Sequence, residues 1–220
     1  NVDELARLGW TRLGVLPIVF APRRYAARPS RRVLRRYGKG LNVLFVGRVA
    51  PHKRHEDLIQ VFCHLKQFVR SDSRLLLVGS TRDTAPYVDA LHRYVLKLGL
   101  SEVVFAGHVS ASELVAAYRC ASVYLSMSEH EGFGKPLIES MLFQLPILAY
   151  AVEGVVDTIG AAGVLFERKD FGRIAAAVDL LLNDDGLRKQ LQAQQTAHVQ
   201  QFLAPVVEQT LLNYLAGVDA

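Results

Sequence analysis

The sequence predicts an α/β fold: a Rossmann-like, doubly wound parallel sheet with helices on both faces and a helical C-terminal tail. Two observations carry this prediction. Between residues 42 and 166, short apolar runs without polar alternation are separated by segments whose apolar residues recur at helical spacing. Such runs are typical of parallel strands that are covered by helices on both faces. After residue 166 only the helical period remains.

Each expected strand is a short apolar run that ends at a turn or a helix. The expected strands are 42–47, 74–79, 102–107, 122–126, 145–150 and 163–166. The expected helices are 55–69, 85–97, 110–119, 171–182, 184–201 and 206–215, with another after Pro136. One helix start is well marked, because Ser110 and Glu113 have the S-x-x-E spacing of a capping box.

The charge of the chain is unevenly distributed. Thirteen of the 26 Lys and Arg residues lie between Arg7 and Arg54, and no Asp or Glu occurs between Glu4 and Glu56. We therefore expect a basic lead-in over 1–40, a Rossmann-like domain over 41–201 and a helical tail over 202–220. Such charge runs are usually exposed linkers or surface helices.

Composition excludes several classes of protein. Half of the residues are apolar and 21% are charged, which suits a folded domain. No apolar run approaches the roughly 18 residues of a membrane span, and the first residues lack a signal-peptide pattern. Cys63 and Cys120 lie in apolar helical patterns, so we expect buried thiols in a reducing compartment rather than a metal site.

Ligands of an open parallel sheet bind beyond the carboxyl ends of its strands. The loop after the first expected strand contains Gly47, Arg48 and Lys53. It has neither the G-x-G-x-x-G nor the Walker A pattern, which disfavours a nicotinamide-binding dehydrogenase. A guanidinium and an ammonium near a helix N-terminus suit a diphosphate instead.

A second loop, after the expected strand 122–126, runs into a helix that carries a further carboxylate. It reads Glu131-Gly132-Phe133-Gly134-Lys135-Pro136, and Glu139 follows. Glycines let the backbone approach a ligand closely, and proline suits the first turn of a helix.

The string from Glu131 to Glu139, E-G-F-G-x-P-x-x-E, resembles the signature of the family 4 retaining glycosyltransferases with the GT-B fold. Gly47-Arg48…Lys53 and the segment 105–109 match the same family in order and approximate spacing. The resemblance extends from about residue 15 to 201. It implies that the chain forms one half of a GT-B fold, the donor-binding C-terminal half, and that it binds donor but does not catalyse transfer alone.

The resemblance also implies roles for individual residues. Arg48 and Lys53 would neutralise the donor diphosphate, Glu139 would accept hydrogen bonds from the ribose hydroxyls, and Glu131 would contact the donor sugar. Arg48, Lys53 and Glu131 are thus the candidate catalytic residues. The remaining candidate donor contacts are Gly47, the base loop His108 and Val109 with Leu114 beside it, and the glycine-rich turn Gly132, Phe133, Gly134 and Lys135.

The chain departs from the family pattern in two places. After Glu139 the family usually has Ala-Met-Ala, whereas this chain has Ser140-Met141-Leu142. In the next expected loop the family often has a Pro-Glu pair, whereas this chain has Val156-Asp157-Thr158. We expect the phosphate and ribose contacts to survive these changes, whereas the family's sugar selectivity does not carry over to this chain as directly. We assign His52 and His130 at most a binding role.

By resemblance we expect a nucleotide-sugar donor, with GDP-mannose favoured over UDP-sugars, and no cofactor. No Asp-x-Asp motif is present, so we expect no metal. The expected partners are an acceptor-binding N-terminal domain of the same polypeptide and a glycan or lipid-linked acceptor of bacterial surface polysaccharide or lipopolysaccharide. We expect a cytoplasmic protein whose basic lead-in faces that domain or anionic lipid at the plasma membrane.

Two other functions stay open. A GT-B sugar-nucleotide epimerase would share the fold and the nucleoside diphosphate. A nucleic-acid-binding module would explain the arginine run, but only Tyr25 and Tyr37 supply aromatic side chains there and no nucleic-acid-binding motif occurs.

Overall fold

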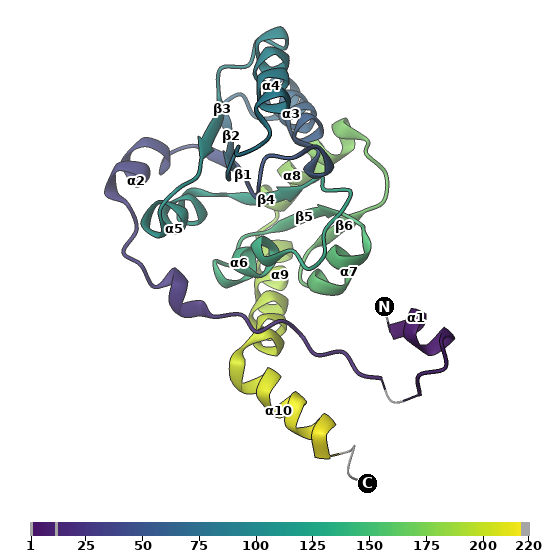
Figure 1. Ribbon diagram of the computed structural model, residues 1–220. Helices are drawn as coiled ribbons and strands as arrows, with labels where there is room; N and C mark the ends of the chain where they lie inside the picture. The colour runs from purple at the N-terminus through teal and green to yellow at the C-terminus, as the bar shows by residue number, and fades with distance from the viewer. Residues whose placement is uncertain (1, 12, 217–220) are drawn as a thin grey trace.

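Six parallel strands form one sheet in the order β3-β2-β1-β4-β5-β6 in the computed structural model, which describes residues 2–11 and 13–216 (Figure 1). All six expected strands are present, each within two residues of its expected ends. The strands are β1 (Leu41–Val46), β2 (Ser73–Val78), β3 (Val103–Gly107), β4 (Val123–Ser126), β5 (Ile147–Tyr150) and β6 (Val164–Phe166).

Helices cover both faces of the sheet, which confirms the predicted doubly wound fold. Helices α3, α4 and α8 lie on one face, and α5 and α6 lie on the other (Figure 1). The helices are α1 (Val2–Arg7), α2 (Arg31–Tyr37), α3 (His55–His64), α4 (Ala85–Lys97), α5 (Ala111–Cys120), α6 (Lys135–Leu142), α7 (Glu153–Ile159), α8 (Phe171–Asn183), α9 (Asp185–His198) and α10 (Ala204–Ala216).

The central strands β1 and β2 are mostly apolar on both faces because neither face meets solvent, with polar residues only in their first two positions, Asn42 in β1 and Ser73 and Arg74 in β2. In β1 the five residues from Leu41 to Phe45 are all buried, and β2 is similar. The two strands pair in unbroken parallel register from Leu41 opposite Ser73 to Val46 opposite Val78. This double burial explains the absence of polar alternation in the sequence.

Several local predictions are confirmed. Ser110 and Glu113 form the capping box of α5, and Pro136 lies in the first turn of α6. Cys63 and Cys120 are free and buried. Helix α3 ends earlier than expected, at His64, and a short π-helical segment, η3 (Leu65–Val69), continues it.

One prediction about a loop is wrong. Val156, Asp157 and Thr158 lie in helix α7, where a loop was expected. The helix was hard to recognise because it has only seven residues and a glycine, Gly154, at its second position. Its buried Val155 and Ile159 have helical i, i+4 spacing, but this is one turn of pattern and too short to stand out.

The lead-in packs against the domain from Phe20 onward. Phe20 is buried, its N–H donates to the carbonyl of Phe202 at 2.7 Å, and it forms an isolated bridge with Leu203. A short 3₁₀ turn, η1 (Pro22–Tyr25), follows, and α2, capped by Ser30, packs on α5. The lead-in therefore contacts both the sheet domain and the start of its helical tail, η4 (Val199–Phe202).

No helix in the part of the chain that the structure describes is both long enough and apolar enough to cross a membrane.

Candidate functional site

The strand order of the sheet reverses between β1 and β4, and this is the position at which open α/β sheets bind ligands. The crossovers from β1 and from β4 run to opposite sides there, an arrangement that in open α/β sheets leaves a crevice beyond the carboxyl ends of the two strands. The two loops that the sequence singles out, 47–54 and 127–134, follow β1 and β4. The topology therefore brings both loops to one place.

Direct contacts join the two loops. The N–H of Glu129 donates to the carbonyl of His52 at 2.9 Å. The Lys53 ammonium donates to the carbonyl of His130 at 3.3 Å and forms an ion pair with the Glu131 carboxylate. The side chains of Lys53 and Glu131 are only 14% and 21% exposed, so solvent screens this pair less than a surface pair. Lys53 and Glu131, predicted separately, thus lie together.

Arg48 follows β1 directly and is exposed. Its guanidinium makes no hydrogen bond or ion pair with any residue that the structure describes. Loss of hydration lowers the pKa of His52, and the neighbouring Lys53, His130 and Arg48 lower it further. Glu131 opposes this lowering of the pKa, and the effects of Lys53, His130 and Arg48 place three basic side chains close to His52, as suits an anionic ligand.

The glycine-rich turn before α6 has a backbone that only glycine adopts readily. Gly134 has a φ of 73°, and a Cβ there would lie 2.6 Å from Cδ1 of Leu137. Gly132, in contrast, is exposed, with no atom within 4 Å of where a Cβ would lie. Phe133 is half-buried and its carbonyl accepts a hydrogen bond from the Thr158 hydroxyl. Lys135 is exposed at the start of the helix.

Glu139 lies on α6, about one turn beyond Lys135, and is buried. One carboxylate oxygen accepts a hydrogen bond from the Tyr25 hydroxyl and the other from the Tyr118 hydroxyl, both at 2.5 Å. The structure therefore gives Glu139 two tyrosine partners and no contact with Arg48 or Lys53. Its contact with ribose stays a prediction.

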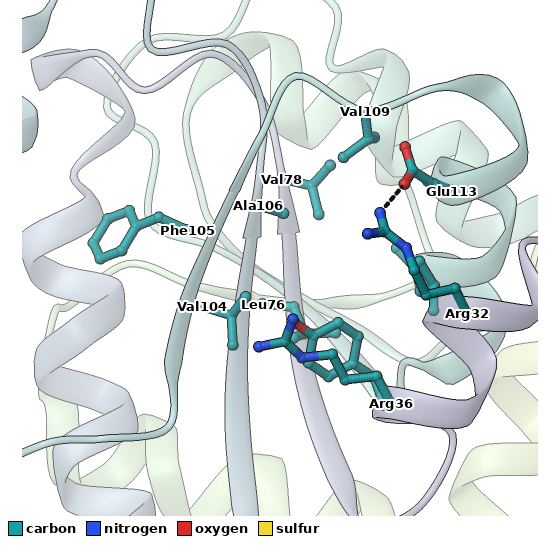
Figure 2. A pocket seen from close by; sticks show the side chains of 12 residues that line it. Arg32, Arg36, Leu76, Val78, Val104, Phe105, Ala106, Val109 and Glu113 are labelled. Atoms are coloured by element: carbon teal, nitrogen blue, oxygen red, sulfur yellow. Dashed lines mark hydrogen bonds and ion pairs between the residues drawn. The ribbon is translucent and has the colours of Figure 1, made fainter.

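The base loop lies at the edge of the sheet. His108 is exposed, whereas Val109 and Leu114 are half-buried. Val109 helps to line a cavity of about 310 Å³ between β2, β3, α2 and α5, and the ion pair between Arg32 and Glu113 lies on one side of it (Figure 2). Neither His108 nor Leu114 lines this cavity. Because the cavity lies beside the edge strand β3, we do not assign it to the crevice between β1 and β4.

Sequence reasoning missed two residues that support the crevice. Gly154 in α7 touches the second loop so closely that a Cβ there would lie 2.0 Å from the carbonyl oxygen of Glu131. Lys169 donates to Asp57 at 2.8 Å and to Glu129 at 2.7 Å, which ties the second loop to α3. Both residues come from segments far away in the sequence, and no local pattern marks either one.

No group of three or more His, Cys, Asp or Glu side chains among the described residues is arranged to hold a metal ion.

Comparison with known proteins identifies the family. The model of the glycosyl transferases group 1 family matches residues 27–198. A D-inositol 3-phosphate glycosyltransferase from Acidothermus cellulolyticus is 34% identical over 185 residues, which is 79% of this chain and 41% of that protein. The capsular polysaccharide biosynthesis glycosyltransferase CapM of Staphylococcus aureus is 32% identical over 70% of this chain and 41% of its own. The chain thus spans about 41% of the length of these relatives.

Solved structures show the same fold. HepE from Anabaena, in complex with UDP and glucose, superposes with a TM-score of 0.75 at 20% identity over 90% of this chain and 55% of HepE. The C-terminal domain of the group 1 glycosyl transferase LpcC from Francisella tularensis superposes with a TM-score of 0.63 at 24% identity, covering 79% of this chain and 94% of that domain. The chain therefore belongs to the glycosyl transferases group 1 family and has the Rossmann-like fold of a GT-B glycosyltransferase C-terminal domain.

Proposed function

We propose that this chain is the nucleotide-sugar-binding half of a retaining hexosyltransferase of family 4. The observation that carries the proposal is the meeting of the two loops at the switch point of the sheet. There the Lys53–Glu131 pair joins the contacting loops, and the exposed Arg48 just beyond β1 has no ion-pair partner among the described residues. A diphosphate needs such cations, and sugar hydroxyls need such a carboxylate.

The chemistry follows from where charge develops. When the bond between sugar and nucleotide breaks, negative charge grows on the departing diphosphate, and Arg48 and Lys53 would stabilise it. Lys53 has three N–H donors, so it can bind phosphate oxygens while it still donates to the carbonyl of His130. The Glu131 carboxylate would then accept hydrogen bonds from the sugar.

For the donor we propose GDP-mannose ahead of UDP-sugars, with no cofactor or metal. One relative, the O-antigen chain mannosyltransferase B of Escherichia coli, is 27% identical over 72% of this chain, and its name supports mannose. The UDP and glucose bound to HepE support the other nucleotide. We propose a role in bacterial surface polysaccharide or lipopolysaccharide synthesis, and the name of CapM supports the polysaccharide part of it.

We further propose that an N-terminal domain of the same polypeptide supplies the site for a glycan or lipid-linked acceptor. The proposal places the protein in the cytoplasm, with peripheral contact to anionic lipid at the inner face of the plasma membrane.

Calorimetric titration with GDP, GDP-mannose, UDP and UDP-glucose tests the site. We expect one nucleoside diphosphate and its sugar conjugate to bind, with the same affinity in Mg²⁺ and in EDTA. Lack of binding of all four ligands to a folded chain would refute the proposed function. Binding that requires Mg²⁺ would refute the metal-free part of it alone.

A further inference from the structure

Glu139 is a buried carboxylate that lies outside the two proposed phosphate-binding loops, on helix α6. The residue is 7% exposed and lies on the inner side of α6. Its Oε1 accepts the Tyr25 hydroxyl and its Oε2 accepts the Tyr118 hydroxyl, each at 2.5 Å. The two tyrosines come from different parts of the chain: Tyr118 from α5, and Tyr25 from the lead-in.

A buried carboxylate is costly unless hydrogen-bond donors surround it. Two phenolic hydroxyls provide one donor to each oxygen. Burial raises the pKa of both tyrosines, and the bond to Glu139 adds to this, so both hydroxyls keep their protons and act as donors. An ionised carboxylate offers about four lone pairs, so Glu139 retains about two for further donors.

The Tyr25 ring is held firmly, although it lies outside the sheet. It stacks on Phe20 at a centroid distance of 5.4 Å and meets Phe143 edge-on at 6.2 Å. Phe20 is fixed in turn by its backbone bond to Phe202, and Phe143 stacks on Tyr118 at 5.0 Å. The packing of its ring therefore fixes the position from which the Tyr25 hydroxyl of the lead-in donates to Glu139.

We propose that Tyr25 is a positioning residue of the donor site: its hydroxyl orients the Glu139 carboxylate so that the remaining lone pairs accept hydrogen bonds from the donor ribose. This inference rests on the proposed function. It couples the segment upstream of the sheet to nucleotide binding, and because such coupling is reciprocal, bound nucleotide would also hold the lead-in in place.

The variant Tyr25→Phe removes the hydroxyl and keeps the ring between Phe20 and Phe143. It would be titrated with UDP or GDP, whichever binds the wild type more tightly, with the 2′,3′-dideoxy form of that nucleotide, and with pyrophosphate. We expect the affinity for the normal nucleotide to fall about ten- to a hundredfold, on the scale of a hydrogen bond to a charged group. The affinities for the dideoxy nucleotide and for pyrophosphate should stay at their wild-type values, since neither presents ribose hydroxyls.

Two further variants serve as comparisons. Tyr37→Phe is the matched control, because Tyr37 also belongs to the lead-in and its hydroxyl makes no hydrogen bond to the residues that the structure describes. It should bind all three ligands like the wild type. Tyr118→Phe removes the second hydroxyl from the same carboxylate and should show the same selective loss, which keeps the inference testable if Tyr25→Phe does not fold.

The outcomes separate this inference from the proposed function. A wild-type chain that binds neither nucleotide nor pyrophosphate contradicts the proposed function. Wild-type binding of normal and dideoxy nucleotide with equal affinity overturns the role of Glu139 and, with it, that of Tyr25. Unchanged nucleotide affinity in folded Tyr25→Phe, or equal losses for all three ligands, also overturns the inference, because a purely structural tyrosine would behave in that way.

Discussion

Arg48 offers the most direct test of the anion site, because its side chain is exposed and unpaired within the described part of the chain. Replacing it by alanine should leave the fold intact and weaken UDP or GDP binding by roughly tenfold or more, as expected for a lost charge-assisted hydrogen bond. Binding of the corresponding nucleoside, which lacks phosphate, should change little. Titration of both ligands measures the difference. Arg119→Ala, an exposed arginine near the end of α5, is the control; equal losses for nucleotide and nucleoside would contradict a phosphate role for Arg48.

His55 makes stability depend on pH. It is 1% exposed at the start of α3, and burial, aided by Lys53, lowers its pKa to about 4 from its ordinary 6.5. The unfolded chain therefore binds a proton at a higher pH than the folded chain does, so acid favours unfolding. The contribution of His55 should be fully present above pH 6.5 and should decrease as the pH falls toward 4. At pH 5 the loss should be about 2 kcal/mol.

Urea unfolding at pH 7 and at pH 5 measures this effect. The variant His55→Leu lacks the titrating group, so its free energy of unfolding should change less between the two pH values than that of the wild type. If the free energy of unfolding changes as much between pH 7 and pH 5 in His55→Leu as in the wild type, groups other than His55 cause the acid sensitivity.

At the scale of elements, α7 supports the second loop through its glycine. A Cβ at Gly154 would lie 2.0 Å from the carbonyl oxygen of Glu131 and 2.7 Å from that of Gly132, so either the helix or the loop must shift. Gly154→Ala should therefore lower both the melting temperature and the affinity for nucleotide. Gly172→Ala in α8 is the matched control, because the nearest atom to its Cβ would lie 3.7 Å away. It should be neutral or stabilising by about 0.5–1 kcal/mol. Full nucleotide affinity in Gly154→Ala would show that the loop does not depend on α7.

Helix α2 carries four of the positive charges of the lead-in. Arg31, Arg35 and Arg36 are exposed and have no ion-pair partner among the described residues, whereas Arg32 pairs with Glu113. Each arginine near an anionic membrane is worth about 1 kcal/mol. We expect the chain to sediment with phosphatidylserine-containing vesicles at low salt, and replacing these three arginines by alanine should abolish most of this binding.

The control for this experiment replaces three exposed cations elsewhere on the molecule: Arg82, and Arg93 and Lys97 of α4. That variant should sediment like the wild type. Equal sedimentation of the wild type with neutral and anionic vesicles would contradict the proposed contact with anionic membrane lipid.

The elements that were predictable from sequence are those with a strong local period. The strands were recognisable because both faces of the sheet are buried, and α5 because its capping box is a local signal. Helix α7 was missed because a seven-residue helix contains too few turns to show a period. In the site, Lys53 and Glu131 could be nominated from their motifs, but their contact depends on the strand order. The bond between Tyr25 and Glu139 joins residues 114 positions apart and has no local signature.

At the scale of the whole molecule, the excess of positive residues behind the formal charge of +5 lies in two regions, the lead-in and the loop after β1, for which we propose different roles. The lead-in contributes α2, with its exposed arginines, and Tyr25, whose hydroxyl donates to Glu139. Arg48 and Lys53, at the end of the acid-free stretch, lie instead in the loop after β1, which contacts the loop after β4. We therefore expect the positive charge to serve two separate surfaces, with the proposed donor at the loops after β1 and β4.

Nucleotide binding should stabilise the whole domain, because the crevice is assembled from loops on both halves of one sheet. A ligand that binds only the folded state at 100 times its Kd adds about 2.7 kcal/mol. For a domain of this size, that raises the melting temperature by roughly 5–10 °C. We expect this increase with UDP or GDP, together with no sugar transfer by the chain alone, since the acceptor site is proposed to lie on another domain. Thermal unfolding and a donor-consumption assay on the same sample measure both. Transfer to an acceptor by this chain alone would contradict the division of donor and acceptor sites, whereas an unchanged melting temperature at saturating nucleotide would contradict the crevice itself.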